Sequence, residues 1–282
     1  MKIGFNLLLW TAHVERQHWQ VLEELKRCGY DGVEIPVFEG DPDHYAELGR
    51  ELDRLGLERT VIALFPGTEM NPIGADAAQR EAGLKHMTWI LDCTRALGAK
   101  VVGGPLHSTL GHFSGEATTS AEKERGVAFH RAAGNLAAER GVTIVLEALN
   151  RFECYFLNTM RDLDAYLAEV NHLNVQGMYD TFHANIEEKD PIAAVSDIAP
   201  HLKHVHVSEN DRGTPGKGHV DFAATFTALK QAGYDGWITI EAFGRALPPL
   251  AAATRVWRDF APSPTEVYSE GFKLIRDGWQ AA

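Results

Sequence analysis

The chain has 282 residues, of which 45% are hydrophobic and 23% are charged, and its formal net charge is −12. This composition is typical of a soluble globular protein, and the length is sufficient for one large domain with a substantial core. The excess of acidic residues disfavours nucleic acids and anionic membrane surfaces as partners, because both carry negative charge.

The cysteines and the N-terminus indicate a protein of the reducing cytoplasm. Cys28, Cys93 and Cys154 are odd in number and lack CxxC spacing, so a disulfide framework is not expected. The apolar N-terminal stretch is not followed by a small-residue cleavage site, and we interpret it as a first strand rather than a signal peptide. No apolar run approaches the ~18 residues of a membrane span.

Short apolar runs alternate with longer segments of helical periodicity along the whole chain. The expected strands are 2–8, 32–37, 58–65, 100–106, 143–149, 174–180, 202–208 and 237–243. The expected helices are 15–28, 43–56, 76–97, 119–140, 161–171, 190–199, 220–232 and 249–259, followed by a last helix at 264–279.

This alternation predicts an α/β protein with a parallel (β/α)8 barrel, the TIM barrel. The alternative is an open, doubly wound sheet. It is disfavoured because no GxGxxG follows the first strand, and because the candidate site residues are spread over four strand ends. No linker or low-complexity segment interrupts the chain. We therefore expect residues 1–282 to form a single barrel domain with a C-terminal helical extension.

Chemically reactive side chains stand at the ends of four successive strands of the second half of the chain. A carboxylate at the end of a buried strand is costly unless it is paired or holds a metal ion. The spacings between these residues are 33, 26 and 35 residues, each about one strand–helix unit. The sequence therefore predicts a ring of strands converging on one cation, with the ligands Glu147, Asp180, His206 and Glu241.

The carboxylates also have structural interpretations. Glu147 could form an ion pair with Arg151, and Asp180 could be a turn or cap residue. The apolar runs before Glu147 and Glu241 favour a functional role for both, because Glu is rarely fully buried.

The histidines of the seventh strand leave one question open. His204 and His206 alternate, so both lie on one face of the strand, and the sequence does not decide which enters the barrel. We expect His201 and His204 to be surface or helix-packing residues.

Two Glu, one Asp and one His form an oxygen-rich ligand set that suits Mn²⁺, Mg²⁺ or Co²⁺ better than a structural Zn²⁺. A cation bound to a carbonyl oxygen and to the hydroxyl on the next carbon makes the proton on that carbon removable. Two carboxylates on opposite sides could then act as base and acid. This chemistry is that of an epimerase or an aldose–ketose isomerase.

Several segments resemble the D-tagatose/D-psicose 3-epimerase group of the xylose-isomerase-like TIM barrels. The resemblance spans the chain and is closest over residues 143–262. The segments that carry it are ALNRFECYFLNT (148–159), YDTFHANIEE (179–188), KHVHVSENDRGTPGKGH (203–219), DGWITIEAF (235–243) and VWRDFAP (256–262).

The resemblance implies a ketose 3-epimerase that inverts carbon 3 through a cis-enediolate, with a hexulose or pentulose such as D-tagatose, D-psicose, D-fructose or L-ribulose as substrate. It implies one divalent metal per chain, usually Mn²⁺, and a homodimer or homotetramer. Glu147 and Glu241 would be the catalytic acid/base pair as well as metal ligands. Glu153, His183 and Arg212 would bind the substrate's first oxygens, although Arg212 could instead be a solvated loop residue.

One loop departs from the resemblance. The loop HSTLGHFSG carries His107, Ser108 and His112 where the family has an aromatic-rich segment, which leaves open the choice between hexulose and pentulose.

A hydroxypyruvate isomerase or inosose dehydratase is the main alternative function. An abasic-site endonuclease would need more zinc ligands and a basic groove. A sugar-binding protein without turnover would not need an acid/base pair.

Overall fold

Eight parallel strands close into a barrel in which each strand pairs with its sequence neighbours and the last pairs with the first. The computed structural model describes all residues, 1–282. Every strand begins within one residue of its expected position, and the barrel prediction is confirmed. The strands are β1 (Lys2–Asn6), β2 (Gly32–Pro36), β3 (Glu58–Ile62), β4 (Val101–Gly104), β5 (Thr143–Glu147), β6 (Val175–Asp180), β7 (Leu202–Val207) and β8 (Trp237–Ile240).

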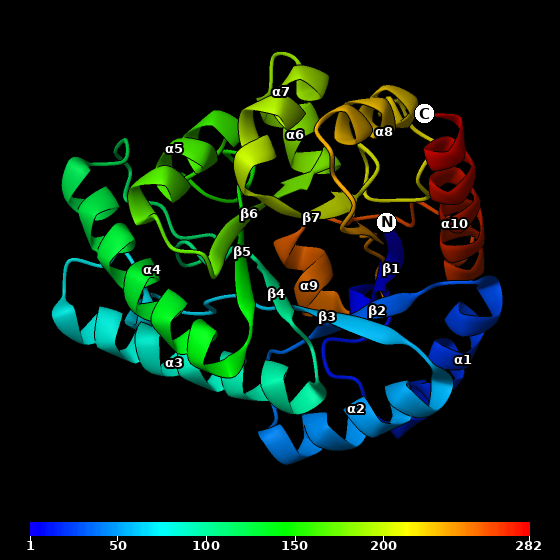
Figure 1. The fold of residues 1–282 in the computed structure, drawn as a ribbon, viewed down its shortest axis with the longest axis horizontal. Helices are drawn as coiled ribbons and strands as arrows, with labels where there is room; N and C mark the ends of the chain where they lie inside the picture. The colour runs from blue at the N-terminus through cyan, green and yellow to red at the C-terminus, as the bar shows by residue number, and fades with distance from the viewer.

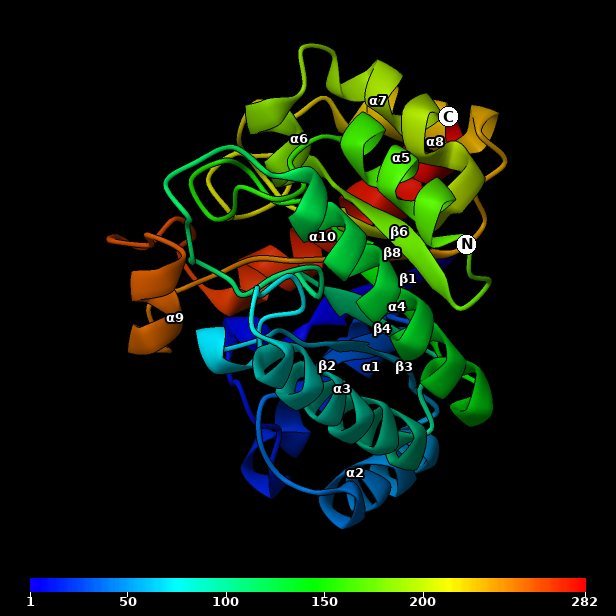
Figure 2. The same ribbon diagram turned by 90° about the vertical axis from the view of Figure 1, so that its left-hand side faces the viewer.

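A ring of helices surrounds the barrel (Figures 1 and 2). Most were expected from the sequence, but α6, which begins directly at the end of β6, was not. The helices are α1 (Trp19–Cys28), α2 (Pro42–Leu55), α3 (Ala77–Leu97), α4 (Ser120–Arg140), α5 (Met160–Val170), α6 (Thr181–Glu187), α7 (Pro191–Ile198), α8 (Phe222–Gln231), α9 (Pro248–Ala253) and α10 (Pro264–Ala281).

The helix ends follow local sequence signals. Four helices end at a glycine in the left-handed conformation, as at Gly56 with φ 66°, which a side chain would strain. Thr119 caps α4 through a reciprocal capping box with Glu122, and Thr159 caps α5. These signals fix where each helix stops and the next strand starts.

The last two helices are arranged differently from the sequence expectation. The segment expected as the eighth barrel helix forms only the short α9, which Figure 1 shows near the centre of the ring and Figure 2 shows projecting from one end. The C-terminal helix α10 instead packs against α8, α1, β1 and β8. It therefore completes the ring between the last and the first helix.

The barrel interior carries polar side chains at matching heights. The register aligns Asn6 of β1 with Glu34 of β2, and Glu34 with Thr60 of β3. On the other side of the barrel, Asp180 of β6 aligns with His206 of β7. All five side chains are buried, so the barrel brings polar groups from both halves of the chain into one enclosed layer.

None of the helices combines the length and the apolar composition that crossing a membrane requires.

The close contact of α2 with α3 gives a prediction for stability. A Cβ at Gly49 of α2 would lie 2.6 Å from the carbonyl oxygen of Leu97 at the end of α3. Although alanine favours helix by up to about 1 kcal/mol, we expect Gly49→Ala to lower the free energy of unfolding by about 1–3 kcal/mol. Urea denaturation measures this, with Arg50→Ala on the exposed face as the control, expected within about 0.5 kcal/mol of wild type. A more stable Gly49→Ala variant would contradict the packing.

Candidate metal centre and active site

Four buried side chains converge at the C-terminal ends of β5 to β8. Glu147 and Asp180 are the last residues of their strands, His206 is the last but one of β7, and Glu241 directly follows β8. One potential ligand atom from each lies within 4.8 Å of the ligand atoms of the others. Arg151, the alternative partner of Glu147, instead pairs with Glu187 at 2.9 Å. The four residues could therefore hold one metal ion.

Three of the atoms that face one another in this cluster have no hydrogen-bond partner. Glu147 Oε1, Asp180 Oδ2 and His206 Nδ1 are buried and have no hydrogen-bond partner. Buried polar atoms are nearly always satisfied, so three such atoms in one place mark a site for a further group. Three carboxylates and one imidazole fit a hard divalent cation.

Asp180 is held by the backbone that follows it. Its Oδ1 accepts hydrogen bonds from the N–H groups of Phe182 (2.6 Å) and His183 (3.2 Å) and so caps α6. Its Oδ2 is left facing His206 Nδ1 at 3.5 Å. Asp180 is therefore both the cap residue that the sequence allowed and a member of the cluster.

Burial and neighbouring carboxylates raise the pKa values of the two glutamates. Burial, and then the nearby Glu241 carboxylate, raise the pKa of Glu147 well above its usual value. Burial raises the pKa of Glu241 to about 7. A carboxyl group with a pKa near neutrality can both accept and return a proton at physiological pH, as acid–base catalysis requires.

His206 carries the positive charge of the cluster when no cation is bound. Burial alone would lower the pKa of His206, but the Glu34 carboxylate and then Glu241 raise it well above its usual value. His206 Nδ1 lies 3.5 Å from Glu241 Oε1 and 3.9 Å from Glu147 Oε1, so the imidazolium sits among the carboxylates. A divalent cation would take over this role.

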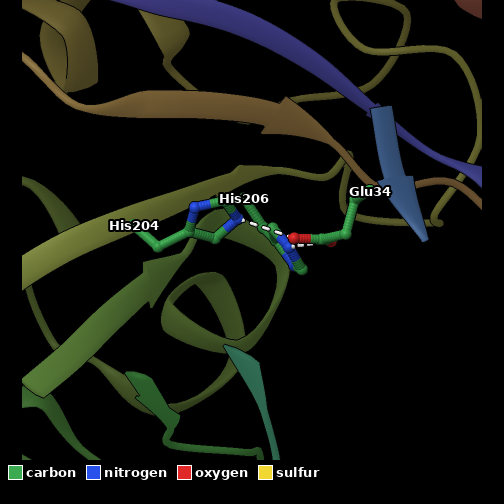
Figure 3. A group of neighbouring side chains, drawn as sticks. All are labelled: Glu34, His204 and His206. Carbon is green, nitrogen blue, oxygen red and sulfur yellow. Dashed lines mark hydrogen bonds and ion pairs between the residues drawn. The ribbon is translucent and has the colours of Figure 1, made fainter. Parts of the chain in front are cut away.

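His204 corrects the sequence expectation. It was expected at the surface or against a helix, yet it is fully buried inside the barrel with His206, and both side chains point towards Glu34 of β2 (Figure 3). Successive side chains of a strand point to opposite faces, so residues 204 and 206 lie on the same face of β7, and that face is the barrel interior. Glu34 was missed, although it interrupts the apolar run GVEIPV, the same signal that marked Glu147.

The three expected substrate-binding residues form a second group next to the cluster. Arg212 Nη1 donates to Glu153 Oε1 at 3.0 Å, and Arg212 Nη2 lies 3.2 Å from His183 Nε2. Arg212 is buried, with its guanidinium 3.9 Å from the ring centre of Phe182 and 4.8 Å from that of Phe243. The alternative of a solvated loop arginine is therefore wrong.

Hydrogen bonding fixes the tautomer of His183. Its Nδ1 accepts the backbone N–H of Asn150 at 3.0 Å, and burial lowers its pKa, so the neutral ring carries its proton on Nε2. That nitrogen lies 3.7 Å from Glu147 Oε1. His183 can therefore donate a hydrogen bond into the site.

A pocket opens onto these two groups of residues. Its lining combines polar side chains with apolar ones, among them Leu250 of α9. This mixture of surfaces is typical of a site for a small organic molecule. The polar lining residues are Glu147, Glu153, His183, Arg212, Glu241 and Thr254, and the apolar ones include Leu8, Phe38, Ile62, Leu110 and Phe243.

Comparison with known proteins identifies the family. The family described as "Xylose isomerase-like TIM barrel" matches residues 22–277. The chain belongs to this family. It is 31% identical over 281 residues to a ketose 3-epimerase of Arthrobacter globiformis, covering 98% of this chain and 96% of that protein.

Solved structures of similar proteins agree with this assignment. The structure of an L-ribulose 3-epimerase superposes with a TM-score of 0.92 at 28% identity, covering 99% of this chain and 95% of the other. A D-psicose 3-epimerase of Clostridium cellulolyticum, solved with D-tagatose, superposes with a TM-score of 0.90 at 28% identity, covering 100% and 99%. The expected resemblance to ketose 3-epimerases is confirmed.

In this xylose isomerase-like barrel, the histidines of the loop after β4 lie away from the cavity. His107 is fully buried, with Nδ1 2.9 Å from Ser108 Oγ, and His112 is half-buried. The loop instead contributes Pro105 and Leu110 to the cavity wall. The side of the cavity nearest this loop is therefore apolar.

His107 gives a prediction for pH dependence. Burial, and then nearby His130, lower the pKa of His107 to about 3, whereas in the unfolded chain it is about 6.5. Below about pH 6.5 the unfolded state therefore binds a proton that the folded state does not, and stability falls with falling pH. We expect the stability advantage of wild type over His107→Asn to shrink by about 1.4 kcal/mol per pH unit between pH 6 and 4. Urea denaturation of the metal-free proteins measures this, and parallel pH curves would contradict it.

Proposed function

We propose that this protein is a metal-dependent ketose 3-epimerase that removes and returns the proton at carbon 3 of a free ketose. The observation that carries the proposal is the pair Glu147 and Glu241, two buried carboxyl groups that line one cavity and belong to the cluster able to hold a cation. Similarity to named ketose 3-epimerases over nearly the whole chain supports the same reaction.

Glu147, Asp180, His206 and Glu241 would hold the divalent cation. The buried atoms without hydrogen-bond partners and the oxygen-rich ligand set support this assignment. When bound, the cation polarises the carbonyl and the neighbouring hydroxyl of the ketose, which makes the proton at carbon 3 more acidic.

Glu147 and Glu241 would exchange the proton from opposite sides. They come from β5 and β8, which two further strands separate, so they reach the cavity from different parts of the barrel wall. One carboxylate takes the proton from carbon 3 and leaves a planar cis-enediolate. The other carboxyl then delivers a proton to the opposite face, and carbon 3 is inverted.

Arg212, His183 and Glu153 would hold the first oxygens of the ketose. Arg212 and His183 can both donate hydrogen bonds, and Glu153 can accept them from sugar hydroxyls. Burial tends to raise the pKa of Glu153, but Arg212 outweighs this and lowers it, so Glu153 is ionised at neutral pH. Arg212 and Glu153 are already paired, so little ordering of these two side chains is needed when the sugar binds.

The proposal also includes the metal, the oligomeric state, the location and the substrates expected from the sequence. Mn²⁺ is the expected metal, with Mg²⁺ or Co²⁺ as substitutes, and the expected form is a cytoplasmic homodimer or homotetramer. D-Tagatose, D-psicose, D-fructose and L-ribulose are the candidate substrates. A hydroxypyruvate isomerase or inosose dehydratase on the same scaffold is not favoured, because the named relatives are epimerases of ketoses.

Isotope exchange tests the reaction. We would strip the protein of metal, restore Mn²⁺, and incubate it in D₂O with each of the four candidate ketoses while proton NMR follows carbon 3. We expect metal-dependent deuterium at carbon 3 together with the 3-epimer. Exchange at carbon 1 with aldose formation would assign an isomerase instead, and no exchange on any sugar would overturn the epimerase.

The acid/base pair gives a prediction for mutants. Because each carboxyl group would transfer a proton, we expect Glu147→Gln and Glu241→Gln to lower kcat by about 10²–10⁴-fold. Circular dichroism should report an unchanged fold. The control is Glu58→Gln, at the other end of the barrel, where the exposed carboxylate pairs with Lys2. Near-wild-type turnover by either active-site variant would exclude the pair.

A further inference from the structure

A third buried carboxylate, Glu34, lies beneath the proposed metal centre and is not one of its ligands. It extends from β2 across the barrel interior to His204 and His206 of β7, on the opposite wall (Figure 3). Its Oε2 lies 2.7 Å from His206 Nε2, and its Oε1 lies 2.9 Å from His204 Nε2. Nothing in the proton-transfer chemistry above requires this residue.

Polar side chains surround both oxygens of the Glu34 carboxylate. Its Oε2 also accepts from Asn6 Nδ2 at 2.9 Å, and its Oε1 also accepts from Thr60 Oγ1 at 2.9 Å. Each oxygen therefore has two polar neighbours; three of these four contacts are hydrogen bonds, whereas His204 Nε2 lies close without forming one. Both oxygens of Glu34 thus accept hydrogen bonds, unlike the unpartnered atoms of the cluster above.

The contact with Glu34 decides which nitrogen of His206 faces the cluster. A carboxylate only accepts hydrogen bonds, so the 2.7 Å contact requires a proton on His206 Nε2. In the neutral imidazole the lone pair is then on Nδ1, the atom that faces Asp180 and Glu241 at 3.5 Å from each. A carboxylate behind a metal-bound histidine also raises the basicity of the ligand nitrogen.

We infer that Glu34, supported by His204, is a positioning residue that holds His206 with Nδ1 towards the centre and so sets its affinity for the divalent cation. Asn6 links Glu34 to a second member of the cluster, because its Nδ2 donates to both Glu34 Oε2 and Glu241 Oε1, the latter at 3.3 Å. The inference rests on the proposed function only in taking His206 as a metal ligand.

A second cation held by Glu34, His204 and His206 is the competing interpretation, since their ligand atoms also lie within 4.8 Å of one another. It would require His206 to give up the Nε2 proton while Nδ1 served the first cation. Three donors, from Asn6, Thr60 and His206, already hydrogen-bond to Glu34, so the structure favours the hydrogen-bonded arrangement.

Direct metal titration tests the inference independently of turnover. Metal-stripped wild-type protein is titrated with Mn²⁺, and free Mn²⁺ is measured by electron paramagnetic resonance. We expect one Mn²⁺ per chain in wild type and a 10- to 100-fold larger dissociation constant in Glu34→Gln, about the loss found for partners of metal-bound histidines. Raising the Mn²⁺ concentration should restore most of kcat in this variant, because Glu34 does not touch the substrate cavity.

Two further variants keep the test decisive. His204→Asn leaves Glu34 in place but removes its supporting partner, and we expect a smaller increase of the dissociation constant; it replaces Glu34→Gln if that variant does not fold. Thr60→Val is the matched control, because it removes a contact of Glu34 that touches neither histidine, and it should bind Mn²⁺ like wild type.

The outcomes separate this inference from the proposed function. A folded Glu34→Gln with the wild-type dissociation constant would overturn the role of Glu34 and leave the metal centre intact. An equal loss of Mn²⁺ affinity in Thr60→Val would mean that any change of packing around Glu34 weakens binding, and it would also overturn the specific role of Glu34. Two Mn²⁺ per wild-type chain would assign the lower cluster to a second cation. Absence of Mn²⁺ binding by wild type would overturn both the metal centre and the inference.

Discussion

Three carboxylates and one imidazole are enclosed together at the C-terminal end of the barrel, and the surrounding structure is organised to make this possible. Isolated charges of one sign in a buried space are strongly unfavourable unless they are neutralised. Here Glu147 and Glu241 respond with raised pKa values, while His206 holds a proton. A divalent cation would remove the need for these protons, and the unsatisfied atoms of the cluster are aimed at the place it would take.

The backbone and the barrel interior hold two of these candidate ligands in place without using the atoms that face the site. Asp180 is fixed by the N–H groups at the start of α6, and His206 by Glu34. In both cases one side of the ligand group is satisfied by the protein and the other is left free. Such an arrangement costs little reorganisation when a cation binds, because the ligands are already oriented.

The cavity above the centre divides the expected chemistry between two surfaces. The polar part of the lining combines the carboxylates with Arg212, Glu153 and His183, which suits the oxygens of a ketose. The apolar part, which includes Leu110 and Leu250, offers few hydrogen bonds to a sugar's remaining hydroxyls. Selectivity on that side would therefore come from shape, and shape discriminates weakly among sugars of similar size.

The sequence by itself determined the alternation of strands and helices, the barrel, and the four residues at the ends of β5 to β8. It could do so because strand and helix periodicities are local, and because Glu147, Asp180 and Glu241 end apolar runs in which a charge is conspicuous. Glu34 carried the same signal within its apolar strand and was overlooked. The end of α2 at Gly56, in the left-handed conformation, follows an equally local signal.

Only the tertiary structure decided how distant strands meet. Whether His204 points to the interior depends on the barrel closing around that face of β7, and its partner Glu34 lies on the opposite wall, 170 residues earlier in the chain. The burial of Arg212 depends in the same way on Phe182 and Phe243, which come from two other strand ends. The places of α9 and α10 were also undetermined, because two amphipathic helices can compete for one position in the ring. Local patterns specify elements, whereas contacts between elements arise only when the barrel closes.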